Sequence, residues 1–403
     1  MSNSPEDQIS DFLSRTDPVP QTSQEYMQLW MAFRNLGEHA EADSRLTPYA
    51  ATIAAGNRFR MMGEVENALT QYARAVVLRP ELPFAYARMA DLLSAMHRFR
   101  EAAHALTQAA ERGNWIDRLL RMDDALYLQV QAHAIEHLAG PSLEGRLRPA
   151  NQRAVLYVCC DPVYCNSFLV GLVRSFLLHG NLNALIHIHI VNPNQTIEPT
   201  MAEVTKIAGA SAIACTFEHT DLSNLNETQH KTYYACARFL NLPQLLEHYD
   251  CPIIVVDADI LVVHSVSELL DAAQQVDVRL LSLDPIRCDS WARFSASVLI
   301  FNQTTAARGF AARVRAWILY WIDQQVMTWF LDQIAIHAIY AQTQLREEKI
   351  AFSFIPTPFL EYCSPAQAHA EPKPETVFWS VTASIEQNWT KLESAVYRRY
   401  SLP

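Results

Sequence analysis

The chain has 403 residues and half of them are hydrophobic, which predicts two or three domains with sizeable cores. Its formal net charge of -11, without a long run of Lys or Arg, argues against nucleic acids and anionic membrane surfaces as main partners. The sequence lacks a stretch of about 18 uncharged apolar residues, so no transmembrane segment is expected. Its eight cysteines are scattered without a C-x-x-C motif, which favours free thiols in a reducing cytoplasm over zinc sites or disulfides.

The first third of the sequence has a polar start and a repetitive continuation. Residues 1–21 are polar, contain prolines, do not resemble a signal peptide and are expected to be disordered. Residues 49–82 and 83–116 carry small and aromatic residues at matching offsets, with a period of 34. Small residues let two antiparallel helices approach closely, and aromatic side chains fill the space between them. The pattern comprises Gly56, Phe59, Gly63, Ala68, Tyr72, Ala75 and Pro80, and then Tyr86, Ala90, Leu93, Phe99, Ala102, Leu106 and Ala109.

This pattern resembles the tetratricopeptide repeat family, although His97 and Asn114 replace the usual Gly and Pro of the second unit. A partial unit precedes it around Leu36-Gly37-Glu38, and residues 117–138 have the pattern of a capping helix. The resemblance implies that residues 22–140 form an all-α solenoid with a concave face. Two roles remain open for it: packing against the next domain, or gripping a peptide of a partner or acceptor.

Residues 141–152 are expected to form a linker, because Gly and Pro interrupt the helical pattern there. Residues 153–403 then alternate strands and helices, which indicates an α/β domain with a mostly parallel sheet and helices on both faces. Ligands of such sheets bind beyond the carboxyl ends of the strands, where Asp161 and Asp257 are expected. The expected strands are 154–159, 184–191, 212–217 and the run that ends at Asp257, and the expected helices are 166–179, 198–208 and 232–246.

The most informative motif is Asp257-Ala258-Asp259, the only D-x-D of the sequence, which lies between two apolar runs. Carboxylates at i and i+2 project to the same side of a strand. Oxygen ligands at this spacing suit Mg²⁺ or Mn²⁺, which in turn neutralises a diphosphate. The alternative is a strand-end turn with two solvated aspartates. Because the ten glycines form neither G-x-G-x-x-G nor a P-loop, a bound phosphate would need a metal, side chains or a helix N-terminus.

Several segments within residues 153–395 occur in a familiar order. They are Leu156 to Tyr164, Tyr233 to Leu240, Val255 to Ile260, Asp284 followed by Phe294 to Asn302, and Leu331-Asp332-Gln333. Together they resemble the GT-A glycosyltransferases, and most of all the retaining enzymes of glycosyltransferase family 8. The resemblance implies a Rossmann-like GT-A sheet of nucleotide-diphospho-sugar transferases. It also implies a metal-dependent transfer of a sugar, with retention, from a UDP-sugar to an acceptor.

The resemblance also implies the roles of residues on the donor side. Asp161 and Tyr164 would hold the nucleoside, and Arg238 would lie near the nucleotide. Asp257 and Asp259 would bind Mn²⁺ (or Mg²⁺), with Asp257 also serving the diphosphate. Such a cation acts as a Lewis acid on the leaving diphosphate.

On the sugar and acceptor side, the resemblance implies Asp332 and Gln333 beside the sugar and Asp284 near the acceptor. These three are the candidate catalytic residues. The sequence departs from the family where Ser295-Ala296-Ser297 replaces Asn-Ser-Gly. The family's late His and its Gly-Lys loop have no clean match, and the region of His369 and Lys373-Pro374, or that of Trp379 to Thr382, would take their place.

Each candidate also has a purely structural interpretation. Tyr164 would be a half-buried core aromatic, Arg238 the ion-pair partner of a neighbouring acid, and Asp332 an acid on a helix surface. His187 and His189 share one face of a strand, where a core-lining role accounts for them without a metal. The stripe of Trp317, Tyr320, Trp321 and Trp329 is expected to be packing rather than a sugar platform.

The sequence therefore predicts a cytoplasmic metal-dependent glycosyltransferase with a UDP-sugar donor and a protein, glycan or lipid-linked acceptor. The repeats would recognise the acceptor or a protein partner, or mediate self-association. The alternative is a degenerate domain that binds the nucleotide-sugar without turnover, with the repeats as a protein-interaction scaffold.

Overall fold

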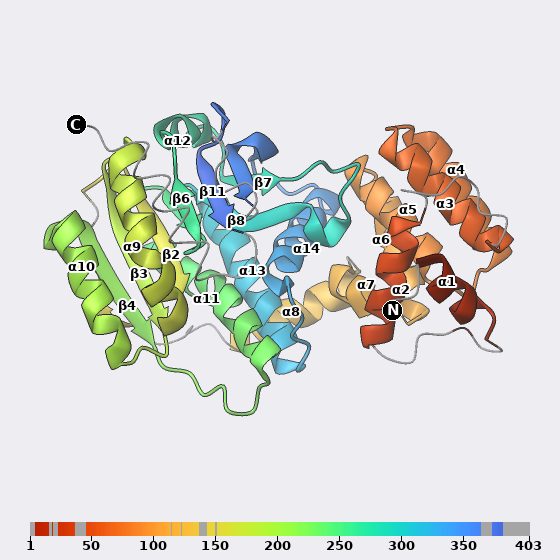
Figure 1. Ribbon diagram of the computed structural model, residues 1–403, viewed down its shortest axis with the longest axis horizontal. Coiled ribbons are helices and arrows are strands. Elements are labelled where there is room, and N and C mark those ends of the chain that lie inside the picture. Colours follow the sequence, from red (N-terminus) through yellow and green to blue (C-terminus); the bar gives the residue numbers. More distant parts are fainter. Residues whose placement is uncertain are drawn as a thin grey trace. The chain divides into compact units, whose positions relative to one another are not determined.

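The chain forms two compact units. A computed structural model describes residues 5–15, 18, 23–36, 46–113, 115–121, 123–136, 143–149, 151–363 and 373–381 (Figure 1). The first unit comprises Met1–Gln129, Asp284–Arg293 and Ile334–Glu348, and the second comprises Val130–Leu283, Phe294–Gln333 and Lys349–Pro403. Two pieces of the later sequence thus belong to the same unit as the predicted repeats, a division that differs from the expected boundary at residues 141–152.

Paired helices occupy the positions of both predicted repeats. The Thr47 hydroxyl caps α3 by accepting a hydrogen bond from the Ala50 amide (3.3 Å), and Pro48 begins that helix. Helix α3 packs against α4, and α5 packs against α6. The helices of this part of the chain are α1 (Pro5–Leu13), α2 (Ser23–Asn35), α3 (Pro48–Met61), α4 (Val65–Leu78), α5 (Phe84–Ala95), α6 (Phe99–Glu111), α7 (Trp115–Leu120) and α8 (Asp124–Glu136).

The packing inside each pair follows the pattern of small and aromatic residues. A Cβ atom on Gly56 of α3 would lie only 2.4 Å from the ring of Tyr72 in α4, so the absent side chain makes room for the ring. Gly63 turns the chain between α3 and α4 with a φ of +77°, and His97 does so between α5 and α6 with a φ of +60°. The histidine therefore adopts the left-handed conformation that glycine adopts in the first pair.

Two stretches differ from the sequence prediction. Helix α1 lies within residues 1–21, for which disorder was expected, and its Ile9 and Phe12 are fully buried. The burial of an apolar helix face therefore explains why this segment forms a helix despite its polar composition. The single capping helix expected at 117–138 is instead the pair α7 and α8, where the carboxylate of Asp123 accepts from the Leu126 amide (2.9 Å) before α8. Gly37, Asn114 and the break around Gly140 lie outside the described residues.

The second unit is built on a mixed sheet of eight strands in the order β1-β4-β3-β2-β5-β8-β7-β9. Strands β4, β3, β2 and β5 are parallel neighbours, as predicted, whereas β8 pairs antiparallel with β5 and β7. The strands are β1 (Glu144–Arg146), β2 (Ala154–Cys160), β3 (Ala184–Val191), β4 (Ile213–Glu218), β5 (Ile253–Val256), β7 (Val278–Ser282), β8 (Phe294–Phe301) and β9 (Phe352–Pro356).

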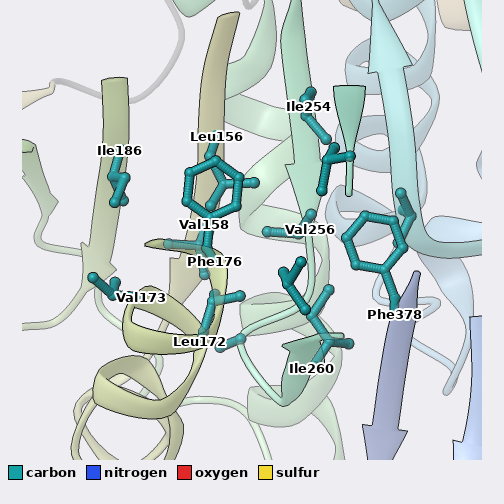
Figure 2. Packing of buried hydrophobic residues seen from close by; sticks show 14 of the residues in the cluster. Leu156, Val158, Leu172, Val173, Phe176, Ile186, Ile254, Val256, Ile260 and Phe378 are labelled. Atoms are coloured by element: carbon teal, nitrogen blue, oxygen red, sulfur yellow. The ribbon is translucent and has the colours of Figure 1, made fainter. Parts of the chain in front are cut away.

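Helices lie on both faces of the parallel half of this sheet. Figure 2 shows Leu156 and Val158 of β2 packed with Leu172 and Phe176 of α9. On the opposite face, His187 of β3 bonds to Tyr249, which directly follows α11. The long helices and the short α12 are α9 (Pro162–His179), α10 (Glu198–Ala208), α11 (Glu227–His248), α12 (Ser267–Ala273), α13 (Thr305–Asp323) and α14 (Leu331–Leu345).

A second, three-stranded sheet has the order β10-β11-β6 and comprises β10 (Leu360–Cys363), β11 (Phe378–Val381) and β6 (Ile260–Val262). Ile260 and Phe378 of this sheet extend the same apolar core (Figure 2). The chain therefore passes from the large sheet into the small one between Val256 and Ile260. Of the helices in the described residues, none is both long and apolar enough to span a membrane.

Candidate functional site

Two neighbouring parallel strands bring two acidic motifs to one edge of the large sheet. Strands β2 and β5 pair in register, with Val158 opposite Val256, and the strand residues are buried. Asp161 follows the end of β2 and Asp257 follows the end of β5. Both residues thus lie at the carboxyl edge, where ligands of parallel sheets bind.

Asp161 is the N-cap of α9, and its Oδ1 accepts a hydrogen bond from the Tyr164 amide (2.8 Å). Burial raises the pKa of Asp161 against the lowering effect of this bond. The half-buried Tyr164 ring meets Phe168 edge-on, with 5.0 Å between ring centroids. Burial, together with the charges of Asp259 and Asp257, raises the pKa of Tyr164 to about 12. The tyrosine ring and the two D-x-D carboxylates are therefore close enough to interact electrostatically.

Asp257-Ala258-Asp259 forms the connection between β5 and β6. The Asp257 amide donates to the carbonyl of Ser297 in β8 (3.0 Å), which anchors the start of the connection to the sheet. The Asp259 side chain is half-buried, and burial together with the charge of Asp257 raises its pKa to about 7. Within the described residues, no Lys, Arg or His forms an ion pair with Asp259. Among the described residues it is thus a carboxylate beside a second carboxylate, without a cationic ion-pair partner.

Arg238 of α11 links the D-x-D motif to the D-Q pair. Its Nη1 donates to Oδ1 of Asp257, and its Nη2 donates to Oδ2 of Asp332 at 2.7 Å. Arg238 and Asp332 are buried, and the Asp257 side chain is 24% exposed. Burial disfavours the charged guanidinium, but the charges of Asp257 and Asp332 outweigh it and hold the pKa of Arg238 above its usual range. Arg238 is therefore an ion-pair partner of neighbouring acids, as its structural interpretation has it.

Asp332 lies in the first turn of α14 with both carboxylate oxygens in use. Oδ2 accepts from Arg238, and Oδ1 accepts from the Gln333 amide (2.8 Å). Burial raises the pKa of Asp332, and the nearby Arg238 charge opposes that rise. The Gln333 side chain is half-buried. The acid is therefore a buried member of an ion cluster and not a solvated residue on a helix surface.

Asp284 is not part of this cluster. It belongs to the first unit, is exposed, and its Oδ1 accepts from the Ile286 amide at 2.9 Å. Its other oxygen lies 3.6 Å from Arg287, three residues along the chain. Its observed interactions are thus local to its own turn.

Ser297, whose carbonyl accepts from the Asp257 amide, was expected from the sequence only as part of a family motif. The register of β8 shifts between Leu280 and Leu281 of its partner strand, which places a bulge at the Ser295-Ala296-Ser297 segment. Within it the Ser297 amide donates to the Ser295 hydroxyl (3.2 Å). Polar residues that interrupt an otherwise apolar strand were the available signal for this irregularity.

The region expected to take the place of the family's late His and Gly-Lys loop is only partly described. His369 lies outside the described residues, and Lys373 and Pro374 are exposed. Trp379 and Ser380 of β11 are buried and pair antiparallel with Leu261 and Ile260 of β6. Strand β11 therefore runs beside the strand that begins directly after Asp259.

Two carboxylates suit a hard divalent cation that completes its coordination with phosphate oxygens and water. Asp257 and Asp259 fit that pattern because both supply oxygen and Asp259 has no cationic partner among the described residues. Across the described ranges, no cluster of three or more His, Cys, Asp or Glu side chains is arranged to hold a metal by itself. Asp257 and Asp259 therefore suit a cation that binds together with an anionic ligand.

His187 and His189 take part in a buried polar network. The two His187 nitrogens lie 2.6 Å from the Tyr249 hydroxyl and 2.9 Å from the Thr216 hydroxyl, and His189 Nδ1 lies 2.9 Å from the same Thr216. His189 Nε2 lies 3.5 Å from Glu218. These partners account for both rings.

The residues of the predicted aromatic stripe differ in their burial. Trp317 is fully buried in the core, and its ring centroid lies 5.8 Å from that of the half-buried Trp321. Trp329 is 48% exposed.

No family model matches the chain, and no curated protein matches it. Solved structures do resemble it. The apo bifunctional glycosyltransferase WbbM is 15% identical with a TM-score of 0.43 over 63% of this chain, which spans only 53% of that protein. The galactosyltransferase LgtC, in complex with donor and acceptor sugar analogues, is 14% identical with a TM-score of 0.42, over 61% of this chain and 99% of that one.

Mouse xyloside xylosyltransferase 1 in its apo form is also similar, with 10% identity and a TM-score of 0.35 over 58% of this chain and 98% of that one. Similarity at this level concerns the course of the chain alone. A donor, an acceptor and a reaction have to be inferred from the residues.

Proposed function

We propose that this protein is a metal-dependent glycosyltransferase that uses a nucleotide-sugar, a UDP-sugar, as its donor. The observation that carries the proposal is the Asp257–Arg238–Asp332 ion cluster at the carboxyl edge of the parallel strands, next to Asp259, which forms no ion pair with any described residue. Carboxylates gathered without enough counter-charge are costly unless a cation joins them. A nucleoside diphosphate brings the phosphate oxygens that such a cation needs.

In this proposal each donor-side residue has a role that agrees with its contacts. Asp257 and Asp259 hold Mn²⁺ or Mg²⁺. Tyr164, half-buried beside them, provides a ring face for the base. Asp161 accepts from the nucleoside with its second oxygen, while its Oδ1 continues to cap α9. The amides at the start of α9 face the same edge and favour negative charge there.

Arg238 acts through its two aspartates. Its Nη1 donates to Asp257 and its Nη2 donates to Asp332. It therefore fixes the orientation of a metal-binding carboxylate and keeps the first turn of α14 in place. Gln333, which follows in that turn and is half-buried, is the group available to orient sugar hydroxyls.

The transfer breaks the bond between the anomeric carbon and the diphosphate oxygen, whose electron pair leaves with the diphosphate. The acceptor oxygen forms the new bond and releases its proton. A bound cation supplies Lewis-acid stabilisation of the leaving diphosphate. Asp332 and Gln333 border the sugar, where a negative or polar group favours an oxocarbenium-like transition state. Retention of configuration and a role of Asp284 toward the acceptor are part of the same proposal.

The test is a thermal shift with UDP and Mn²⁺, each alone and together, with GDP as the matched nucleotide. We expect a rise in melting temperature only for UDP with Mn²⁺, corresponding to about 2.7 kcal/mol at 100 times the dissociation constant. An equal rise for UDP with a chelator would rule out a metal-bridged diphosphate. No rise with any nucleoside diphosphate would rule out the donor site.

The alternative is a domain that binds the donor without turnover, and the missing Gly-Lys motif favours it. A panel of UDP-sugars distinguishes the two hypotheses, because an active enzyme slowly hydrolyses its donor and releases UDP even without its acceptor. Binding in the thermal shift without Mn²⁺-dependent UDP release for any sugar, with or without added acceptors, would favour the alternative.

A further inference from the structure

The first unit contains a buried cluster of charges that the proposed transfer does not use. Three arginines from three helices contribute to it: Arg34 of α2, Arg60 of α3 and Arg88 of α5, here called the arginine face. Asp91 of α5 lies among them. These repeat residues alone carry three positive charges and one negative charge. The remaining member, Asp289, comes from Asp284–Arg293, the segment that connects β7 to β8.

Asp289 is the side-chain anchor of that segment. It is 1% exposed; Arg88 donates to its Oδ1, Arg60 lies 3.6 Å from the same oxygen, and Arg34 lies 3.3 Å from Oδ2. Burial opposes ionisation, but the three arginines outweigh it and hold the pKa of Asp289 below its usual range. Asp289 is the N-cap of a short 3-10 turn, yet its carboxylate does not cap that turn. It faces the arginines instead.

The repeat helices also bind the backbone of the segment. Arg60 donates to two of its carbonyls, that of Ile286 and, at 2.6 Å, that of Cys288. Asp91 Oδ1 accepts from the Ser290 amide at 2.8 Å. These contacts fix the positions of three backbone groups, two carbonyls and one amide, so they select a conformation as well as a charge.

An aromatic contact completes the attachment. The Trp291 ring of the segment meets the Trp30 ring of α2, with 5.7 Å between ring centroids. Backbone contacts, one buried carboxylate and one aromatic anchor are the usual elements of peptide recognition. A purely apolar contact would stabilise the fold at least as well as buried ions, because ions lose their hydration. The charges favour instead one particular segment.

We propose that the arginine face is a receptor for a peptide segment that presents a buried aspartate, and that the chain's own residues 284–293 occupy it through Asp289. The repeats thus act in cis, as a clamp on the connection that leads into β8. Without the segment, the three arginines and Asp91 would carry two uncompensated positive charges, and Asp289 balances one of them. The inference does not depend on the proposed transfer reaction.

Hydrogen exchange of the full-length protein tests the clamp. Asp289→Asn keeps the shape and removes the charge, so we expect at least tenfold faster exchange of the amides of residues 286–290. Arg287→Gln is the matched control, since Arg287 lies in the same segment but is exposed, and its side chain pairs with Asp284 alone among the described residues. It should change these rates less than twofold. Exchange in Asp289→Asn at the wild-type rate would overturn the proposal.

Arg60→Lys provides a second variant in case Asp289→Asn does not fold. It retains the charge but lacks the forked guanidinium that reaches two carbonyls at once. Amides 286–290 should again exchange faster, and alkylation of the half-buried Cys288 thiol should accelerate in parallel. Protection of the segment equal to that of wild type would contradict the recognition of its backbone by Arg60.

Binding in trans tests the receptor itself. A synthetic peptide of residues 284–293 should bind the full-length Asp289→Asn protein, where the cis segment competes poorly. It should not bind the wild-type protein measurably, because the tethered segment has a high effective concentration. The same peptide with Asp289→Asn should bind neither. Failure of the native peptide to bind the variant, or equal binding to both proteins, would show that this face is ordinary packing and not a receptor.

Discussion

Nη2 of Arg238 lies 2.7 Å from Oδ2 of Asp332, and both side chains are buried. The same guanidinium also contacts Asp257, so one cation balances two carboxylates of the candidate site. Buried ion pairs are more costly to break than to replace, because a lone buried charge has neither water nor a partner. The relationship therefore makes Arg238 a structural as well as a functional residue.

Arg238→Gln should destabilise the protein by about 3–5 kcal/mol, since it leaves Asp257 and Asp332 without their cation. Urea unfolding measures the loss. Lys231→Gln on the same helix is the control: Lys231 is exposed and pairs with Glu227 at 2.7 Å, so its loss should cost about 0.5 kcal/mol or less. Adding Asp332→Asn to Arg238→Gln should restore part of the stability. A loss below about 1 kcal/mol for Arg238→Gln would mean that the cluster is open to water.

Asp259→Asn should leave the fold intact and abolish the stabilisation by Mn²⁺ with UDP. The substitution removes one of two adjacent carboxylates, so the metal-free variant should melt at or above the wild-type temperature. Thermal shifts at several Mn²⁺ concentrations check both effects. Asp250→Asn, an exposed acid shortly before β5, should behave like wild type. If Asp259→Asn keeps the full Mn²⁺ response, the pair is structural and the cation binds elsewhere.

Much of the α/β domain could be predicted because its signals are local. Buried parallel strands appear as continuous apolar runs, and β3 and α10 begin and end where the sequence predicts. The mostly parallel sheet and the position of its carboxyl edge follow from the alternation of strands and helices. The sequence alone therefore places Asp161 and Asp257 at the same edge of the sheet. The ion pair of Arg238 with Asp257 was one of two interpretations that its position allowed.

The rest depends on residues that are far apart in the sequence. Arg60 binds a carbonyl 228 residues later, and Asp91 binds an amide 199 residues later. Such contacts leave no periodic pattern, because the segment that fills the arginine face is short and irregular. Asp284 was assigned to the acceptor by its place in a motif, but its chain segment belongs to the other unit. Family motifs order the pieces of a chain without giving the unit in which each piece packs.

His187 makes the stability of the protein sensitive to acid. Burial, together with the charges of His189 and His248, lowers the pKa of His187 to about 3, against about 6.5 for an unfolded histidine. Between these two pH values the histidine is protonated in the unfolded chain but not in the folded protein. The free energy of unfolding therefore falls as the pH drops below about 6.5. His187→Gln should reduce the dependence between pH 6.5 and 4.5 by up to about 1.4 kcal/mol per pH unit. Urea unfolding at several pH values measures it, with the exposed His104→Gln as a control that should keep the wild-type dependence.

Gly56→Ala tests the close approach of α3 and α4. The added Cβ would lie 2.4 Å from the ring of Tyr72, which is fully buried and donates its hydroxyl proton to Asn57 (2.8 Å), so the ring cannot move aside freely. We expect a loss of about 1–3 kcal/mol, although alanine favours helices more than glycine does. Gly309→Ala in α13 is the matched control, because nothing lies within 4 Å of its Cβ position, and it should be neutral or stabilise by up to about 1 kcal/mol. Chemical unfolding of both variants measures the difference, and an equal response would mean that the first pair of helices is packed more loosely than the Gly56–Tyr72 contact requires.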